Sequence, residues 1–244
     1  MEADLNITEQ PNKNPFSQIL NVLVSPISAF ADLKPKTYAW LPLLLILIMQ
    51  VAVIVVYFLN VDFSWMMEQS VLATGREIPP EQQQAMERMS GGVMRGITVG
   101  FAVIAVIVMW SLFFALLALY YMIVSSFTAD GIKYGKWFGF NWWTALPYTL
   151  TATIAIISVF LSSNGQILQN DLNPLTLNNL VFHKKIGEPG FGFLGFIDAA
   201  LVWSLILQVV GYRTWTGKSY GSAIFIVAIP FVLLFSIFAL ISFR

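Results

Sequence analysis

Residues 191–216 read FGFLGFIDAALVWSLILQVVGYRTWT, and the only charged residue between Phe191 and Tyr212 is Asp198. A helix needs about 20 predominantly apolar residues to cross the hydrocarbon core of a bilayer. The stretch is that long and that apolar, so it predicts a transmembrane helix over about residues 192–212. The other apolar runs of the chain are interpreted on the same basis.

Asp198 is costly inside a bilayer, because a carboxylate at the centre of a spanning helix raises the insertion free energy by about 2.5–3.5 kcal/mol. Its side chain is therefore expected to face protein or a water-filled cavity. Two readings are open: a substrate, ion or proton site, or a structural group that caps a helix end or bonds a neighbouring helix. The expected partners are hydroxyls or amides on other spans, such as Thr149, Thr151 or Thr153, or water entering from the external side. Trp203, five residues further on, is expected on another helix face.

The composition of the whole chain is that of a membrane protein. Of its 244 residues, 57% are hydrophobic and 11% are charged, whereas a soluble domain has about 25% charged residues. The apolar runs predict five spans, over about residues 40–60, 97–127, 140–161, 192–212 and 222–243. We expect an all-α polytopic membrane protein with a disordered tail over residues 1–14 and a single membrane domain over residues 15–244.

An amphipathic helix is predicted before the first span. Asn14 and Pro15 suit its N-cap and first helical position, and apolar residues then recur at helical spacing up to Phe30. The segment is too short and too polar to span, so we expect it to lie in the membrane interface, with a kink at Pro26. The alternative to direct lipid binding is packing beneath the bundle.

The second predicted span is unusually long, because no charge occurs in the 34 residues between Arg95 and Asp130. Such a helix extends about 50 Å against a hydrocarbon core of about 30 Å, so it must tilt or project beyond the membrane. Its start carries Gly92, Gly96 and Gly100 on one face, a spacing that lets another helix approach closely. We expect this face to pack within the chain, with homodimerisation as the alternative.

The third predicted span contains Pro147, which removes one helical hydrogen bond. Nearby threonines are expected to satisfy the freed carbonyl groups, although a proline beside polar residues also suits a solute path. Trp137, Trp142 and Trp143 precede the proline and predict an aromatic belt at the membrane surface.

The charges of the short turns predict the orientation of the chain. These turns carry four basic residues, Lys133, Lys136, Arg213 and Lys218, against one acid, Asp130. Because basic residues concentrate in short cytoplasmic loops, we expect the turns and the N-terminus to be cytosolic and the C-terminus external.

One set of motifs resembles the Yip (Ypt-interacting protein) domain family in its bacterial branch. Asp198, followed by Trp203 and Gly211 and then by a polar turn over residues 216–219, is similar to the fourth span of that family. The preceding residues 173–178, NPLTLN, resemble the loop before that span.

The entry segment of the family is similar to residues 25–30, which include Pro26, and the likeness covers about residues 16–240. It implies a bacterial cytoplasmic (inner) membrane protein with the same orientation. The Asp-Leu-Tyr-Gly-Pro type motif of the Rab-binding eukaryotic members is not in this sequence, so the resemblance does not imply Rab binding here.

Several classes of function are excluded by the sequence. The formal net charge is zero, so no basic surface indicates nucleic-acid binding. The chain has no cysteine and a single histidine, His183, which excludes thiol chemistry and paired-histidine metal sites. The P-loop, G-x-S-x-G and H-E-x-x-H motifs are missing. We therefore expect no enzyme activity, no catalytic residue, no cofactor and no metal.

The favoured interpretation is an integral membrane scaffold or accessory protein of the Yip type. Its expected partners are the lipid bilayer and either other membrane proteins, such as a transporter complex, or a second copy as a homo-oligomer. It would organise the bilayer or assist transport machinery. The alternative is a small-solute or ion transporter or channel that uses the intramembrane Asp198 and the kinked span at Pro147.

Overall fold

The computed structural model describes residues 14–72 and 92–243. All regular elements in these ranges are helices, which confirms the predicted all-α class. In chain order they are α1 (Ser17–Val24), α2 (Pro26–Leu33), α3 (Trp40–Asn60), α4 (Phe63–Leu72), α6 (Gly92–Thr128), α7 (Tyr134–Thr144), α8 (Pro147–Leu161), the 3₁₀ helices Ser163–Gly165 and Gln169–Asp171, the π-helix Asn178–Phe182, α9 (Phe191–Phe196), α10 (Ala199–Thr216) and α11 (Tyr220–Ser242).

Four helical stretches of the described chain are long and apolar enough to cross a membrane. They are α3, α6, the α7–α8 stretch Tyr134–Leu161, and α11. The fifth predicted span differs, because α9 and α10 are separate helices joined at Ile197 and Asp198. Its membrane-crossing character is therefore not established by length and hydropathy, as it is for the other four.

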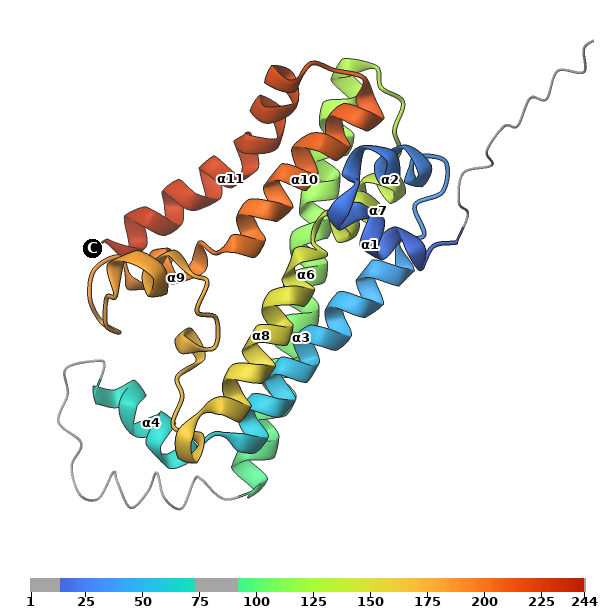
Figure 1. Ribbon diagram of the computed structural model, residues 1–244. Coiled ribbons are helices and arrows are strands. Elements are labelled where there is room, and N and C mark those ends of the chain that lie inside the picture. Colours follow the sequence, from blue (N-terminus) through green and yellow to red (C-terminus); the bar gives the residue numbers. More distant parts are fainter. Residues whose placement is uncertain (1–13, 73–91, 244) are drawn as a thin grey trace, which may run out of the picture.

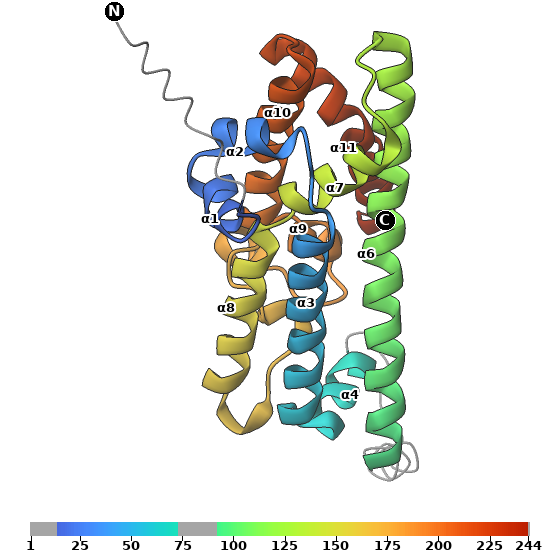
Figure 2. The same cartoon turned by 90° about the vertical axis from the view of Figure 1, so that its right-hand side faces the viewer.

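α6 runs the length of the molecule (Figures 1 and 2). Its 37 residues extend about 55 Å at 1.5 Å per residue. α3 and α8 pack beside each other along its N-terminal half, and the hairpin of α10 and α11 lies towards its C-terminal end. The turns after α6 and after α10 are at the same end of the molecule, where Lys218 Nζ lies 3.3 Å from Asp130 Oδ1.

The core of this end is aromatic. Its tryptophans, which include Trp137, Trp142 and Trp143, are fully buried, and the ring of Trp137 stacks on that of Tyr212 with centroids 5.5 Å apart. The predicted aromatic belt at the membrane surface is therefore wrong. Apolar rings suit both a lipid interface and a protein core, and here α7 lies between α6 and α10, which bury them.

The N-terminal segment forms an elbow rather than one kinked helix. Ser25 leaves the helical conformation (φ −141°, ψ 59°), and Pro26 occupies the first position of α2, where its missing N–H costs no hydrogen bond. One face of the elbow packs on α10, with Phe30 fully buried. The other face leaves large apolar side chains exposed, namely Phe16, Leu20, Val24 and Ile27. The predicted segment thus both packs on the bundle and keeps an apolar outer row.

Candidate functional site

The break between α9 and α10 is centred on Asp198. This residue adopts an extended conformation (φ −135°, ψ 174°), and its side chain accepts a hydrogen bond from the backbone N–H of Leu201 at 2.7 Å. It is therefore the N-cap of α10. An N-cap aspartate stabilises a helix by about 1 kcal/mol relative to alanine, because it pairs an N–H group that has no partner within the helix.

The second carboxylate oxygen of Asp198 is held by a loop. Asn173 Nδ2 donates to Asp198 Oδ2 at 2.6 Å, and Asn173 Oδ1 accepts from the backbone N–H of Leu175 at 3.0 Å. The backbone joins the same two segments, since Leu177 N donates to Ile197 O at 2.7 Å. Residues 173–177 thus pair with the break.

The expected partners of Asp198 on the third span were wrong. The hydroxyls of Thr149, Thr151 and Thr153 donate instead to carbonyl oxygens of their own helical stretch, three or four residues earlier. Threonine in an apolar helix commonly bonds in this way. The loop amide of Asn173 takes the role that we had assigned to these hydroxyls.

Trp203 and Gly211 follow Asp198 on α10 and have different surroundings. Trp203 is exposed at the surface of the described structure. Asp198 is the N-cap that precedes α10, so the two side chains do not share a helix face. Gly211 lies where α10 meets α2 and α7. A Cβ at Gly211 would lie 2.6 Å from a ring carbon of Phe140 and 3.1 Å from the ring of Phe30, so glycine permits this close approach.

Pro147 is the first residue of α8 rather than an interruption of a continuous helix. The chain leaves the helix at Ala145 (φ −88°, ψ 1°), and α7 and α8 therefore meet at a bend. Because the N–H of the first helical residue has no intrahelical acceptor, proline costs nothing at this position.

The glycine face of α6 has no neighbour in the described chain. A Cβ built on Gly92, Gly96 or Gly100 meets no described atom within 4 Å. The expected packing of this face within the chain is therefore not found among residues 14–72 and 92–243.

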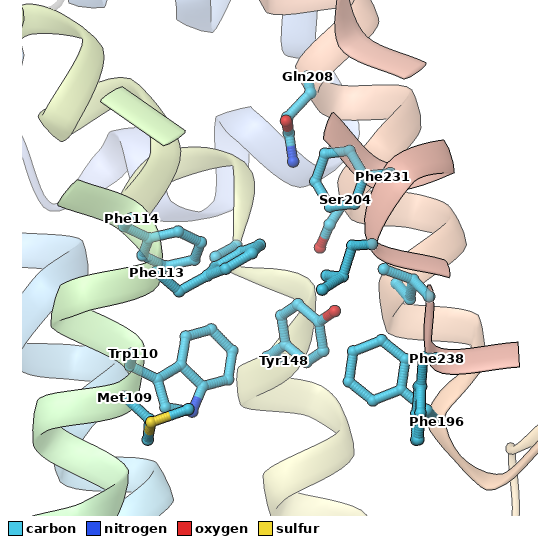
Figure 3. A pocket seen from close by; sticks show the side chains of 13 residues that line it. Met109, Trp110, Phe113, Phe114, Tyr148, Phe196, Ser204, Gln208, Phe231 and Phe238 are labelled. Carbon is cyan, nitrogen blue, oxygen red and sulfur yellow. The ribbon is translucent and has the colours of Figure 1, made fainter. Parts of the chain in front are cut away.

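A cavity of about 400 Å³ lies beside the break at Asp198. Its walls come from α6, α8, α9, α10 and α11 and the bend before α8, and they are mostly aromatic or aliphatic (Figure 3). Phe196 and Leu201, on the two sides of the break, both line it. Three polar side chains are part of the lining, namely Tyr148, Ser204 and Gln208.

The polar residues of the cavity were not identified in the sequence, but a signal for them was present. Ser204 and Gln208 are the polar residues between Asp198 and Gly211, and they are four positions apart. That spacing places them on one face of a helix. Asn173 lies in the NPLTLN stretch that carries part of the family resemblance, but no spacing signal pairs it with Asp198, which is 25 positions away.

Outside the spans, Asp62 caps the start of α4. Its Oδ1 accepts hydrogen bonds from Trp65 N at 3.1 Å and from Ser64 Oγ at 2.8 Å. These bonds, that from the backbone of Trp65 first, hold the pKa of the Asp62 carboxyl below its usual value. No group of three or more His, Asp or Glu side chains in the described residues could hold a metal ion.

Comparison with known protein families gives one match that covers most of these features. The model of the Yip1 domain matches residues 20–241, which include most of the elbow, the four long apolar stretches except the last residue of α11, and the break at Asp198. No curated protein and no solved structure gives a significant match. With nearly its whole length matched to that domain, the chain belongs to the Yip1 domain family of membrane proteins.

Proposed function

We propose that this Yip1-domain protein is a non-enzymatic membrane scaffold or accessory protein that binds another membrane helix through the N-terminal half of α6. The carrying observation is the glycine face of that helix, Gly92, Gly96 and Gly100, which has no described neighbour. The side chains beside it are also exposed; for example, Val93 is 81% and Phe101 71% exposed.

Three glycines on one face of a helix require a physical reason. Each lowers helix stability by about 1 kcal/mol relative to alanine. None of the three has a positive φ that would favour glycine, and no described side chain needs the space. Glycines at this spacing allow the backbones of two membrane helices to approach closely. A partner helix, from another membrane protein or a second copy of the chain, accounts for all three.

The arrangement around Asp198 supports a scaffold over a transporter. Both carboxylate oxygens already accept hydrogen bonds, from Leu201 N and Asn173 Nδ2. A carboxylate used in this way holds the fold together, whereas a transport site needs a group that exchanges partners. The alternative function, a solute or ion transporter using Asp198, therefore has less support.

We further propose that the protein lies in a bacterial cytoplasmic membrane with its N-terminus in the cytosol and its C-terminus outside. Lys133 and Lys218 are on the two short turns that follow α6 and α10, and Lys136 is in the first turn of α7. The two turns lie at the same end of the molecule (Figure 1). Basic residues in short loops favour the cytosolic side. A single membrane domain over residues 15–244 is consistent with this arrangement.

The test is partner capture by crosslinking in cells followed by mass spectrometry. Gly96→Leu should reduce the crosslinked partner or dimer several-fold without lowering the thermal stability of the purified protein, because leucine has the higher helix propensity. Ala105→Leu is the matched control, because Ala105 is also exposed and lies nine residues, or about 180°, around the same helix. Identical partners and yields for both variants and the wild type would remove the proposal.

A further inference from the structure

We propose that the cavity next to the break is a binding site for a neutral lipid with one buried oxygen group. The ligand class is a long apolar chain attached to an uncharged ester carbonyl or hydroxyl, as in a diacylglycerol. This inference is independent of the partner site proposed above. The partner site is at the N-terminal end of α6, whereas the part of α6 that lines the cavity lies within residues 109–114.

The first support is a buried hydroxyl without a partner. Ser204 is 3% exposed, and its Oγ has no hydrogen-bond partner among the described residues. Two other hydroxyls of α10 bond back to carbonyls four residues earlier, those of Thr214 and Thr216. Ser204 Oγ is instead directed towards the cavity, buried just beneath its lining (Figure 3). A buried polar group left unpaired is destabilising, so a ligand oxygen at this point would be favourable.

The second support is the orientation of Gln208. Its Oε1 accepts a hydrogen bond from the hydroxyl of Tyr121 at 2.9 Å, deep in the aromatic core. This bond turns the amide NH₂ towards the cavity, one helical turn from Ser204, and the hydroxyl of Tyr148 points into the same space from α8 (Figure 3). An amide NH₂ only donates, and the two hydroxyls also donate. The cavity is therefore prepared for a ligand that offers an acceptor oxygen.

The rest of the lining decides the charge and shape of the ligand. None of the residues that line the cavity is a lysine, an arginine or another charged residue. The carboxylate of Asp198 caps α10 at Leu201, which is itself a lining residue. An anion would be poorly accommodated there, and a plain hydrocarbon would leave the hydroxyl of Ser204 unpaired. The cavity volume, about 400 Å³, is within the roughly 300–1,000 Å³ typical of small-molecule sites.

The mouth of the cavity indicates the route of entry. Met109, Phe196 and Leu234 line it and are at the same time exposed. Two of these belong to α6 and α11, which are long and apolar enough to span the membrane. The polar side chains Ser204 and Gln208 are buried behind this apolar rim. A lipid would thus enter from the bilayer and place its oxygen group inwards.

The experiment uses the full chain reconstituted in phosphatidylcholine vesicles. The probe is a diacylglycerol with a photoactivatable diazirine and an alkyne in one acyl chain. An alkane and a fatty acid with the same photoactivatable chain serve as comparison probes. After irradiation, mass spectrometry maps the labelled peptides. We expect the diacylglycerol to label the peptides around Trp110 and Phe196 several-fold more than other membrane-facing segments, and more than either comparison probe does.

Two variants test the geometry. Leu234→Trp narrows the mouth and should reduce the specific labelling several-fold, whereas Leu233→Trp, an exposed neighbour that does not line the cavity, should not. Ser204→Ala is nearly isosteric and should remove most of the preference for diacylglycerol over the alkane. Uniform labelling that Leu234→Trp does not change would indicate bulk lipid only and overturn the site. An unchanged preference in Ser204→Ala, or strongest labelling by the fatty acid, would overturn the proposed ligand chemistry.

Discussion

Asn173 donates a hydrogen bond from its side-chain amide to the carboxylate of Asp198 at 2.6 Å, and so joins the loop after α8 to the first turn of α10. The bond has one direction, because an ionised carboxylate only accepts. The same carboxylate accepts from the backbone N–H of Leu201, which lines the cavity, so one side chain joins the loop, the break and the cavity wall. Its direction can be reversed by exchanging the two residue types.

The exchange is the first prediction. Asp198→Asn keeps an N-cap for α10, since asparagine caps as well as aspartate does, but it places two NH₂ groups opposite each other at Asn173. Asn173→Asp places two carboxylates there. Each single variant should lower the melting temperature in detergent, and the double variant, with the donor and acceptor exchanged, should recover most of the loss.

Asp198→Leu provides the contrast to that cycle. It removes the cap and leaves Asn173 without its acceptor, so we expect a loss of about 1–3 kcal/mol of stability. A fully stable Asp198→Leu protein would show that the carboxylate is not structural. If the double variant Asp198→Asn, Asn173→Asp were stable but failed to replace the wild-type protein in cells, the charge of Asp198 would be needed for function, as in the transporter interpretation.

The attachment of the N-terminal elbow gives the second prediction. Trp215 is buried on α10, and its Nε1 donates to the carbonyl oxygen of Phe30 at 2.7 Å. Trp215→Phe removes this bond, worth about 1 kcal/mol, and part of the packing beneath α2. We expect faster proteolysis within the elbow and a lower melting temperature. Trp203→Phe, on the outer side of the same helix, should change neither.

The third prediction concerns the close approach at Gly211. Gly211→Ala places a methyl group 2.6 Å from Phe140, so it should destabilise the bundle by about 1–3 kcal/mol through overpacking. Gly135→Ala is the matched control, because a Cβ there meets nothing within 4 Å and alanine has the higher helix propensity. Thermal unfolding in detergent should separate the two; an equal response would indicate that α7 shifts freely.

The fourth prediction concerns orientation. Reporter fusions after Lys136 and Lys218 should be cytosolic, and a fusion after Lys184, in the long loop before α9, should be external. The corresponding site in the other long loop, after Arg88, lies outside the described residues. An external signal after Lys136 would contradict the positive-inside reading of both short turns, since the ion pair between Lys218 and Asp130 keeps these turns together.

The sequence was sufficient to predict the features that local physics controls. The length and hydropathy of residues 40–60 determine α3, with the same bounds in the structure. The uncharged interval after Arg95 predicts the long helix α6. The cost of a carboxylate in hydrocarbon predicts that Asp198 is shielded from lipid, although it says nothing about which group does the shielding.

Only the tertiary structure decided which apolar surfaces face protein. Trp137 reads as an interfacial residue and is buried, whereas Gly96 reads as a packing position and has no described neighbour. The physical reason is that lipid tails are as apolar as a helix bundle, so hydropathy does not distinguish the two surroundings. The partner of Asp198 was undetermined for a second reason, because Asn173 reaches it only after the chain has folded back through α9.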